Sequence, residues 1–362
     1  MLLPESLTEI GNAAFMRCPE LSEITLPEGV TTLGDSCFER STALGSNIED
    51  IGMPASITRI PNNCFNGCTC FEGTLTIPDQ ITELGTNAFY GCTGYTKVVI
   101  PVDFMYAYNN APFNECTGIT EIYYTKGQTG IMPDVVKEAS NTGNRYSYRL
   151  EYSVRSTLEK VSFEEGITKL GNGAYYFSPE SYYVYTWQKL KTVNLPSTLT
   201  EIGSNAFRGC TALTDITLPE GVTTLGTGCF CGCTAIKAIE DIGMPASLTA
   251  IPNDCFNGCT GLEGTLTIPG RITELGNNAF RGCTGYTKVV IPVDFKYTYG
   301  STPFNECTGI TEIYYTKGTT GVMHDVINGS NATQNHYSAR LEFSVRNTLE
   351  KISFEEGVTR IG

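Results

Sequence analysis

The sequence predicts a β-rich α/β solenoid, in which stacked coils form a parallel sheet on one face and short turns, extended legs or 3-10 pieces on the other. Two observations support this fold class. Residues 94–104 return unchanged as residues 285–295, 191 positions later, within a copied cassette that fills most of the chain. Inside each cassette, a shorter motif recurs at intervals of mostly 23 to 27 residues. A repeat this short contacts only its neighbours, so one solenoid can absorb all 362 residues without a wider core.

An aromatic residue marks each copy of the motif. The eleven markers are Phe15, Phe38, Phe65, Phe89, Phe113, Tyr175, Phe207, Phe230, Phe256, Phe280 and Phe304. A Cys follows three residues after most of them, and Ala or Cys often stands just before. We therefore predict that aromatic rings and Cys side chains form columns inside the solenoid.

Residues 213–218 show how one coil begins. Their apolar side chains are predicted to point inward and their polar ones outward, as in a short strand with one solvated face. The inward set is Leu213, Ile216 and Leu218, and the outward set is Thr214, Asp215 and Thr217. Pro219 ends the strand because it has no N–H for a ladder, and Gly226 suits a turn that needs positive φ. The later Gly-Cys-Phe-x-x-Cys stretch is too short for a stable helix, so we expect a single helical turn or a 3-10 piece.

The full pattern, Leu-x-x-Ile-Thr-Leu-Pro-x-x-Val-Thr-x-Leu-Gly-x-x-x-Phe-x-x-Cys, resembles the BspA-like class of bacterial leucine-rich repeats. The resemblance covers nearly the whole chain. It implies a right-handed leucine-rich-repeat solenoid in a secreted or surface-anchored protein that binds host or matrix proteins, or other cells, without catalysis. It names no ligand, because such repeats occur in proteins with different partners.

The domain organisation follows from the repeat. We expect one solenoid over residues 1–362, made of a first cassette (1–191) and a second (192–362), with both ends inside repeats, as in a piece of a longer protein. Insertions at 125–157 and 316–348 break the period and are expected to be ordered. Within the first, residues 132–139 are predicted to form a short helix with Pro at its first turn, and residues 145–152 an alternating strand.

Charge and hydropathy exclude several classes of partner. The net charge is −14 and the basic residues form no run, so a nucleic acid or an anionic membrane surface is not expected to bind. No apolar run reaches 18 residues, so no membrane span is predicted. The expected location, extracellular or at the cell surface, is implied by the family resemblance.

The 15 cysteines and two histidines invite a metal or catalytic interpretation, which the pattern does not favour. Most cysteines alternate with Ala or Ser between repeats, as small buried residues do. Free thiols are favoured, although neighbouring coils lie close enough, at about 4.8 Å, for a Cys–Cys rung. His324 and His336 have no counterpart in the first cassette and are interpreted as solvated loop residues. No cofactor, metal site or catalytic constellation is predicted.

Two groups of residues are candidate ligand contacts. One is the aromatic run before residue 188, with Tyr182, Tyr183, Tyr185 and Trp187. The other lies on outward strand positions and is present in both cassettes: Lys97, Glu121 and Tyr123, copied as Lys288, Glu312 and Tyr314. Tyr and Trp supply contact area at low entropic cost, but the aromatic run could equally fill space over an irregular coil.

These observations favour a non-catalytic binding or adhesion module that recognises a protein or a glycan through the solenoid face and its insertions. The alternative is a structural spacer that carries another domain. A spacer would be expected to vary on its outward positions, whereas Tyr123 and Tyr314 match between cassettes.

Overall fold

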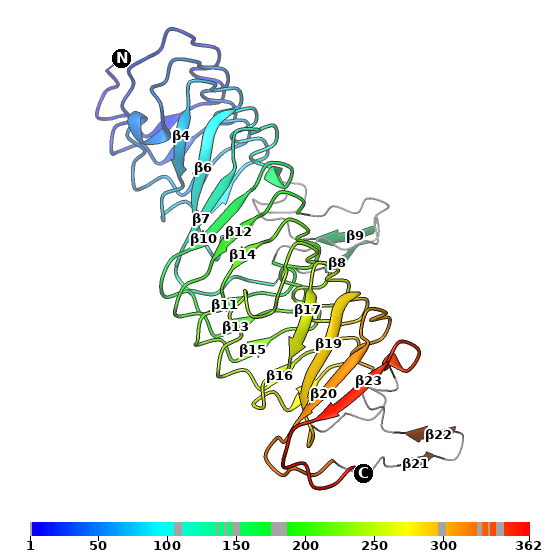
Figure 1. Ribbon diagram of the computed structural model, residues 1–362. Helices are drawn as coiled ribbons and strands as arrows, with labels where there is room; N and C mark the ends of the chain where they lie inside the picture. The colour runs from blue at the N-terminus through cyan, green and yellow to red at the C-terminus, as the bar shows by residue number, and fades with distance from the viewer. Residues whose placement is uncertain are drawn as a thin grey trace. The chain divides into compact units, whose positions relative to one another are not determined.

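The structure is a computed structural model, which describes residues 2–104, 111–134, 137–140, 143–146, 153–174, 187–295, 302–323, 328–331, 334–337 and 344–362. The chain divides into two compact units, Met1–Ile167 and Thr168–Gly362. Both consist mainly of parallel strands joined by turns, as predicted (Figure 1). The cassette limits at 191 and 192 stay a prediction. Within the described part of the chain, no helix has the length and apolar character to cross a membrane.

The first unit contains a parallel sheet with its longest strands. Their order is β4 (Glu72–Thr76), β6 (Gly94–Pro101), β7 (Glu121–Thr125) and β10 (Lys160–Phe163). These strands lie side by side in Figure 1. Successive side chains alternate between the two faces, and Tyr95, Val98 and Ile100 are buried.

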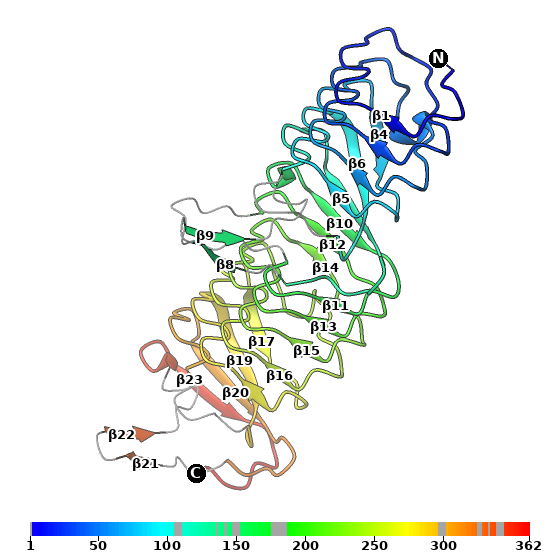
Figure 2. The ribbon, with the colours of Figure 1, turned by 180° about the vertical axis from the view of Figure 1, so that it is seen from behind.

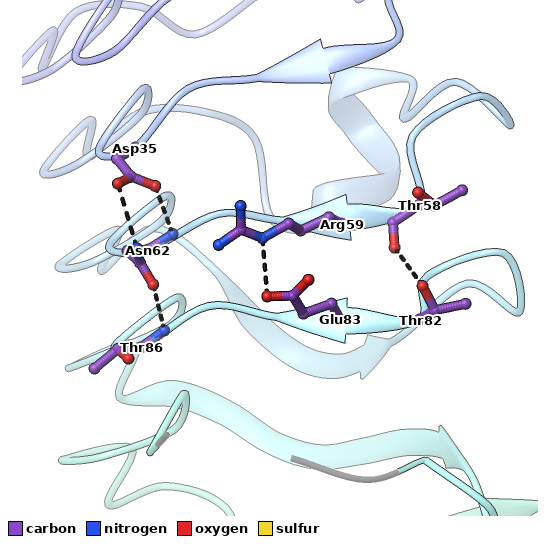
Figure 3. A network of polar contacts seen from close by, with 7 residues as sticks. All are labelled: Asp35, Thr58, Arg59, Asn62, Thr82, Glu83 and Thr86. Atoms are coloured by element: carbon purple, nitrogen blue, oxygen red, sulfur yellow. Dashed lines mark hydrogen bonds and ion pairs between the residues drawn. The ribbon is translucent and has the colours of Figure 1, made fainter. Parts of the chain in front are cut away.

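A second column of two-residue strands forms another leg of the coils. In the first unit, β1 (Glu9–Ile10) pairs in parallel with β2 (Thr32–Leu33), and β3 (Arg59–Ile60) pairs with β5 (Glu83–Leu84). The first residue of each strand is exposed and the second is buried. On the exposed side, Arg59 Nε lies 3.0 Å from Glu83 Oε1 (Figure 3).

Side chains next to this column bond the backbone of the following coil. Asp35 Oδ1 accepts the Asn62 N–H at 3.1 Å, and Asn62 Oδ1 accepts the Thr86 N–H at 2.9 Å (Figure 3). The second unit repeats the arrangement, since Asn253 Oδ1 accepts the Asn277 N–H at 2.7 Å. These bonds fix the register between coils because each joins one coil to the next.

The second unit is built in the same way. In one parallel group, β13 (Glu201–Ile202) lies between β11 (Lys169–Leu170) and β15 (Thr224–Leu225). Two pairs of parallel strands are β12 (Thr192–Asn194) with β14 (Asp215–Ile216), and β16 (Ala250–Ile251) with β18 (Glu274–Leu275). The longest strands follow in the order β17 (Glu263–Thr267), β19 (Gly285–Pro292), β20 (Glu312–Thr316) and β23 (Lys351–Phe354). Figure 2 shows β11, β13 and β15 side by side. The predicted inward set of residues 213–218 is buried and the outward set is exposed.

Gly226 is present for a different reason from the one predicted. The φ of Gly226 is not positive, so the predicted assignment of this residue to a turn that needs positive φ is wrong. Instead, a Cβ at this position would lie 2.1 Å from the backbone nitrogen of Ser204 in the neighbouring coil. Gly85 of the first unit would meet Asn62 N at 2.4 Å in the same way. The glycine is therefore required by the close approach of two coils.

The Phe markers stack into a column within each unit, and all of them except the partly exposed Phe15 are buried. Neighbouring ring centroids are 5.2 to 5.6 Å apart along Phe15, Phe38, Phe65, Phe89 and Phe113. They are 5.4 to 5.7 Å apart along Phe207, Phe230, Phe256, Phe280 and Phe304. The predicted aromatic column is thus confirmed, and its spacing suits offset stacking of rings.

The backbone around the Phe markers, all of which lie in the described part of the chain, is not a helix. In the coil of Phe65, Asn63 has a φ of 53°. The Phe65 N–H bonds Ala88 O of the next coil at 2.8 Å, whereas the Cys68 N–H bonds Phe65 O at 3.1 Å within the coil. The predicted helical turn is therefore reduced to isolated i→i−3 bonds, because alternate N–H groups are used between coils. A 3-10 helix occurs elsewhere, at η1 (Ile48–Ile51).

Each insertion contains a β-hairpin. In the first, β8 (Lys137–Ser140) pairs antiparallel with β9 (Gly143–Tyr146), and in the second, β21 (Asn328–Asn331) pairs with β22 (Gln334–Tyr337). The helix predicted over residues 132–139 is wrong, because the partner strand supplies backbone bonds that an isolated helical turn cannot match. The strand predicted over 145–152 is confirmed at residues 145–146, and residues 147–152 lie outside the described part.

Candidate functional site

The outward residues predicted from the first cassette form one cluster on the sheet. Lys97 Nζ lies 3.1 Å from Glu121 Oε1, and Lys160 Nζ lies 3.4 Å from the same oxygen. Lys97 Nζ also stands over the Tyr123 ring, 5.3 Å from its centroid. The strand register produces this arrangement, since Lys97, Glu121 and Lys160 are aligned across β6, β7 and β10.

The second unit contains the same cluster with nearly the same geometry. Lys288 Nζ and Lys351 Nζ lie 3.1 Å and 3.0 Å from Glu312 Oε1, and Lys288 Nζ is 5.2 Å from the centroid of the Tyr314 ring. Hydrogen bonds from Lys351 and Lys288 hold the pKa of the Glu312 carboxyl below its ordinary value. We call these two groups the strand-face clusters.

Each strand-face cluster has more positive than negative charge, on a chain whose net charge is −14. Its members remain accessible, with 31% of the Lys97 side chain and 43% of the Lys160 side chain exposed. Exposed ion pairs of this kind add little stability. Their main effect is to hold an ammonium group against the tyrosine ring, where a cation–π contact orients both.

A pocket lies at the carboxyl end of the strands in each unit. The first has a volume of about 700 Å³, and its lining includes Ile81, Thr82, Pro101, Asp103, Phe104 and Gly127. The second, of about 690 Å³, is lined by the equivalent Ile272, Thr273, Pro292, Asp294, Phe295 and Gly318. Both volumes fall in the range of small-ligand sites, roughly 300–1,000 Å³.

An aspartate organises the wall of each pocket. Asp103 Oδ2 accepts the N–H groups of Gln128 and Thr129 at 3.0 and 2.9 Å, and the Thr129 hydroxyl at 3.1 Å. Asp294 Oδ2 accepts the N–H groups of Thr319 and Thr320 at 2.8 and 2.9 Å. Asp103 follows β6 and Asp294 follows β19, so these carboxylates hold the start of each insertion against the strand of the preceding coil.

The sequence contained a signal for these aspartates that the prediction did not use. Asp103 and Phe104 end the segment that returns unchanged as residues 285–295, although neither is among the candidate contacts predicted from sequence. Lys160 and Lys351 were likewise omitted from the candidate contacts. Their place beside Glu121 and Glu312 depends on pairing across 39 residues of chain, which the local pattern does not reveal.

Of the four aromatic candidates before residue 188, the structure describes Trp187 alone. Tyr182, Tyr183 and Tyr185 lie outside the described residues. The Trp187 side chain is 7% exposed, which favours the packing alternative for this residue.

No metal site stands out in the part of the chain that the structure describes, where no group of three or more His, Cys, Asp or Glu residues could hold an ion. His324 lies outside the described residues, and His336 belongs to β22.

The fold and its repeated motif define a tandem leucine-rich repeat protein. The model of the "BspA type Leucine rich repeat region" matches six copies, over residues 1–46, 44–144, 151–240, 180–263 and 237–342. The chain therefore belongs to the BspA-type leucine-rich repeat family, as the sequence pattern predicted.

Three of the solved structures to which this chain is similar are of bacterial proteins. A leucine-rich repeat protein from Bacteroides ovatus is 18% identical, with 96% of this chain and 88% of that chain covered and a TM-score of 0.48. A leucine-rich cell surface protein from Faecalibacterium prausnitzii is 22% identical, with 85% and 83% covered and a TM-score of 0.36. A leucine-rich repeat protein from Eubacterium ventriosum is 20% identical, with 84% and 75% covered and a TM-score of 0.37. No curated protein sequence matches the chain.

Proposed function

We propose that this chain is a non-catalytic binding module, extracellular or at the cell surface, that recognises a host or matrix protein or a glycan through its strand-face clusters. The observation that supports this proposal is the occurrence of the same cluster twice. Lys97, Glu121 and Tyr123 have the same strand register, ion pair and cation–π contact as Lys288, Glu312 and Tyr314.

The spacer alternative explains the buried columns but not the clusters. Stacking of coils requires the inward side chains and the close-approach glycines, and it requires no particular outward residue. The two cassettes have also diverged elsewhere, even beside a buried side chain: Asn47, which bonds Tyr95, is replaced by Ala238. Identity of the accessible clusters against this background favours a role in recognition.

The test is a binding screen of the folded protein against matrix proteins and a glycan array. A ligand of the clusters should lose at least tenfold in affinity, or about 1.4 kcal/mol, when Tyr123→Ala and Tyr314→Ala are combined. The matched control is Thr217→Ala, which changes an exposed residue just after β14 and outside both clusters. Binding that is insensitive to the double variant, or no binding by protein shown to be folded, would contradict the proposal and favour the spacer.

A further inference from the structure

Most cysteines beside the aromatic column fall into two classes. In the first class are seven of those three residues after a marker, each of which donates its thiol to a backbone carbonyl of the preceding coil; Cys18 bonds Met16 O of its own coil instead. Cys68 Sγ lies 3.2 Å from Phe38 O, Cys92 Sγ 3.2 Å from Phe65 O, Cys116 Sγ 2.9 Å from Phe89 O, and the second unit repeats this with Cys233, Cys259, Cys283 and Cys307 at 2.9 to 3.1 Å. We call this set the carbonyl-bonded cysteines. Each has its own acceptor in the preceding coil.

The second class stands just before the marker and brings sulfur against sulfur. Cys37 Sγ and Cys64 Sγ are 3.4 Å apart in the first unit, and Cys229 Sγ and Cys255 Sγ are 3.5 Å apart in the second. All four side chains are fully buried. Ala88, Ala206 and Ala279 occupy the same position in other coils, so nothing in the packing demands sulfur here.

The backbone holds each pair in a geometry that a disulfide can span. The Phe38 N–H bonds Cys64 O at 3.0 Å, and the Phe230 N–H bonds Cys255 O at 3.0 Å, so each pair lies in coils that are joined directly beside it. Hydrogen-bonded neighbouring chains lie about 4.8 Å apart. That spacing is within the Cα separation of disulfides, roughly 4.4 to 6.8 Å, and closure to a bond of about 2.05 Å requires only a small shift of the sulfurs.

We propose that Cys37–Cys64 and Cys229–Cys255 are two oxidation sites that close into disulfides between adjacent coils. The oxidant is a low-molecular-weight disulfide such as oxidised glutathione. One thiolate attacks it, forming a mixed disulfide and releasing one thiol, and the partner thiolate then displaces the second thiol. Two protein thiols are oxidised, the small disulfide is reduced to two thiols, and two protons leave the protein sulfurs.

Burial determines when this reaction can occur. Exchange requires a thiolate and access to the sulfur. Burial raises the pKa of the Cys64 and Cys255 thiols well above the ordinary value, and the stacked coils exclude the oxidant. The bonds therefore form while the coils are still assembling, and they are then sealed inside. The approach of the sulfur atoms in the two pairs does not depend on the proposed binding function.

The experiment refolds the full chain from denaturant in a buffer of oxidised and reduced glutathione. Free thiols are then alkylated, and the protein is digested without reduction for mass spectrometry. We expect two pairs of disulfide-linked peptides, one that joins Cys37 to Cys64 and one that joins Cys229 to Cys255. The carbonyl-bonded cysteines should be alkylated. Reduced protein placed in the same buffer after folding should form these bonds about tenfold more slowly or slower still. Equal rates for folded and refolding protein would overturn the folding-coupled route.

Matched variants separate the pairs from the other cysteines. The oxidised protein should unfold at a temperature roughly 5 to 10 °C above that of the reduced protein. Combining Cys37→Ala with Cys229→Ala should abolish that difference, and Ala is already present at this position in other coils. Cys92→Ala, in the carbonyl-bonded set, should retain it.

A parallel preparation controls for disulfide exchange with the more accessible thiols. In it, the partly exposed Cys18, Cys70 and Cys231 are replaced by Ser. The inference would be overturned if alkylation after oxidative refolding of this preparation still modified all four thiols, those of Cys37, Cys64, Cys229 and Cys255. Linkage of these four residues mainly to the carbonyl-bonded cysteines would overturn it as well.

Discussion

The Tyr95 hydroxyl lies 3.4 Å from Asn47 Oδ1, and the equivalent tyrosine of the second unit, Tyr286, has lost this acceptor. Ala238 stands where the first cassette has Asn47. Tyr286 Oη is buried and, among the described residues, has no hydrogen-bond partner. The two units thus contain the same buried ring with and without its polar partner.

Ala238→Asn should stabilise the second unit. Restoring an acceptor for a buried hydroxyl contributes about 1 kcal/mol to the free energy of unfolding. The reciprocal variant, Asn47→Ala, should destabilise the first unit by about 1 to 2 kcal/mol, because Asn47 Oδ1 also accepts the Ile48 N–H at 2.8 Å and caps η1. Urea unfolding, followed separately for each unit, measures both changes. A destabilising effect of Ala238→Asn would show that the site cannot accommodate the added side chain.

Gly226→Ala should destabilise the second unit by at least about 2 kcal/mol, since its Cβ would lie 2.1 Å from Ser204 N and no flexible side chain is there to move. The matched control is Gly270→Ala in the same unit. No heavy atom lies within 4 Å of a Cβ at Gly270, so this change should stay within about 1 kcal/mol of the parent. Thermal unfolding compares the two variants. Equal stabilities would refute close approach as the reason for the glycine.

The inward and outward residues of the strands could be predicted from sequence because a strand alternates its side chains with a period of two. Ile216 and Leu218 follow that rule, whereas the buried Leu213 lies three residues before Ile216 and outside β14. Gly226 could not be explained in the same way. Spacing in a motif shows that glycine is required, but not whether the reason is its φ or the absence of a Cβ near another coil.

Features that depend on pairing between distant residues were predicted less well. The helix expected over residues 132–139 is contradicted by β8, whose partner β9 decides the local structure. The strand-face clusters were predicted only in part, since Lys160 and Lys351 join them through strand register. Asp103 was missed because its partners, Gln128 and Thr129, come from the next coil.

Asp294 should make the stability of the second unit depend on pH. Burial alone would raise the pKa of its carboxyl, but hydrogen bonds from Thr319 and Thr320 outweigh burial and hold the pKa below the ordinary 3.8. A carboxyl with a lowered folded pKa stabilises the fold above the unfolded pKa, and this stabilisation is lost as the pH falls through the folded pKa.

The expected outcome is a loss of stability that starts near pH 4 on acidification and is smaller in Asp294→Asn. A carbon-13 NMR titration of the carboxyl gives its pKa directly. Thr319→Val, which removes one donor, should move that pKa upward. A midpoint for Asp294 above 3.8 in the parent protein would contradict the sign of this prediction.

The strand-face clusters should contribute little to stability. In a double-mutant cycle, the coupling between Lys288 and Glu312 should be about 0.2 to 1 kcal/mol, because both side chains are accessible to solvent, and it should shrink in high salt. Glu312→Gln and Lys288→Met provide the cycle, and Lys169 with Glu201, 2.9 Å apart on β11 and β13, provides a control pair outside the cluster. Similar small couplings at both pairs would mean that stability alone does not explain why the cluster is the same in both cassettes, which favours recognition. A coupling above about 2 kcal/mol at Lys288–Glu312 would instead account for the duplicated cluster by folding, and the spacer would then become the better explanation.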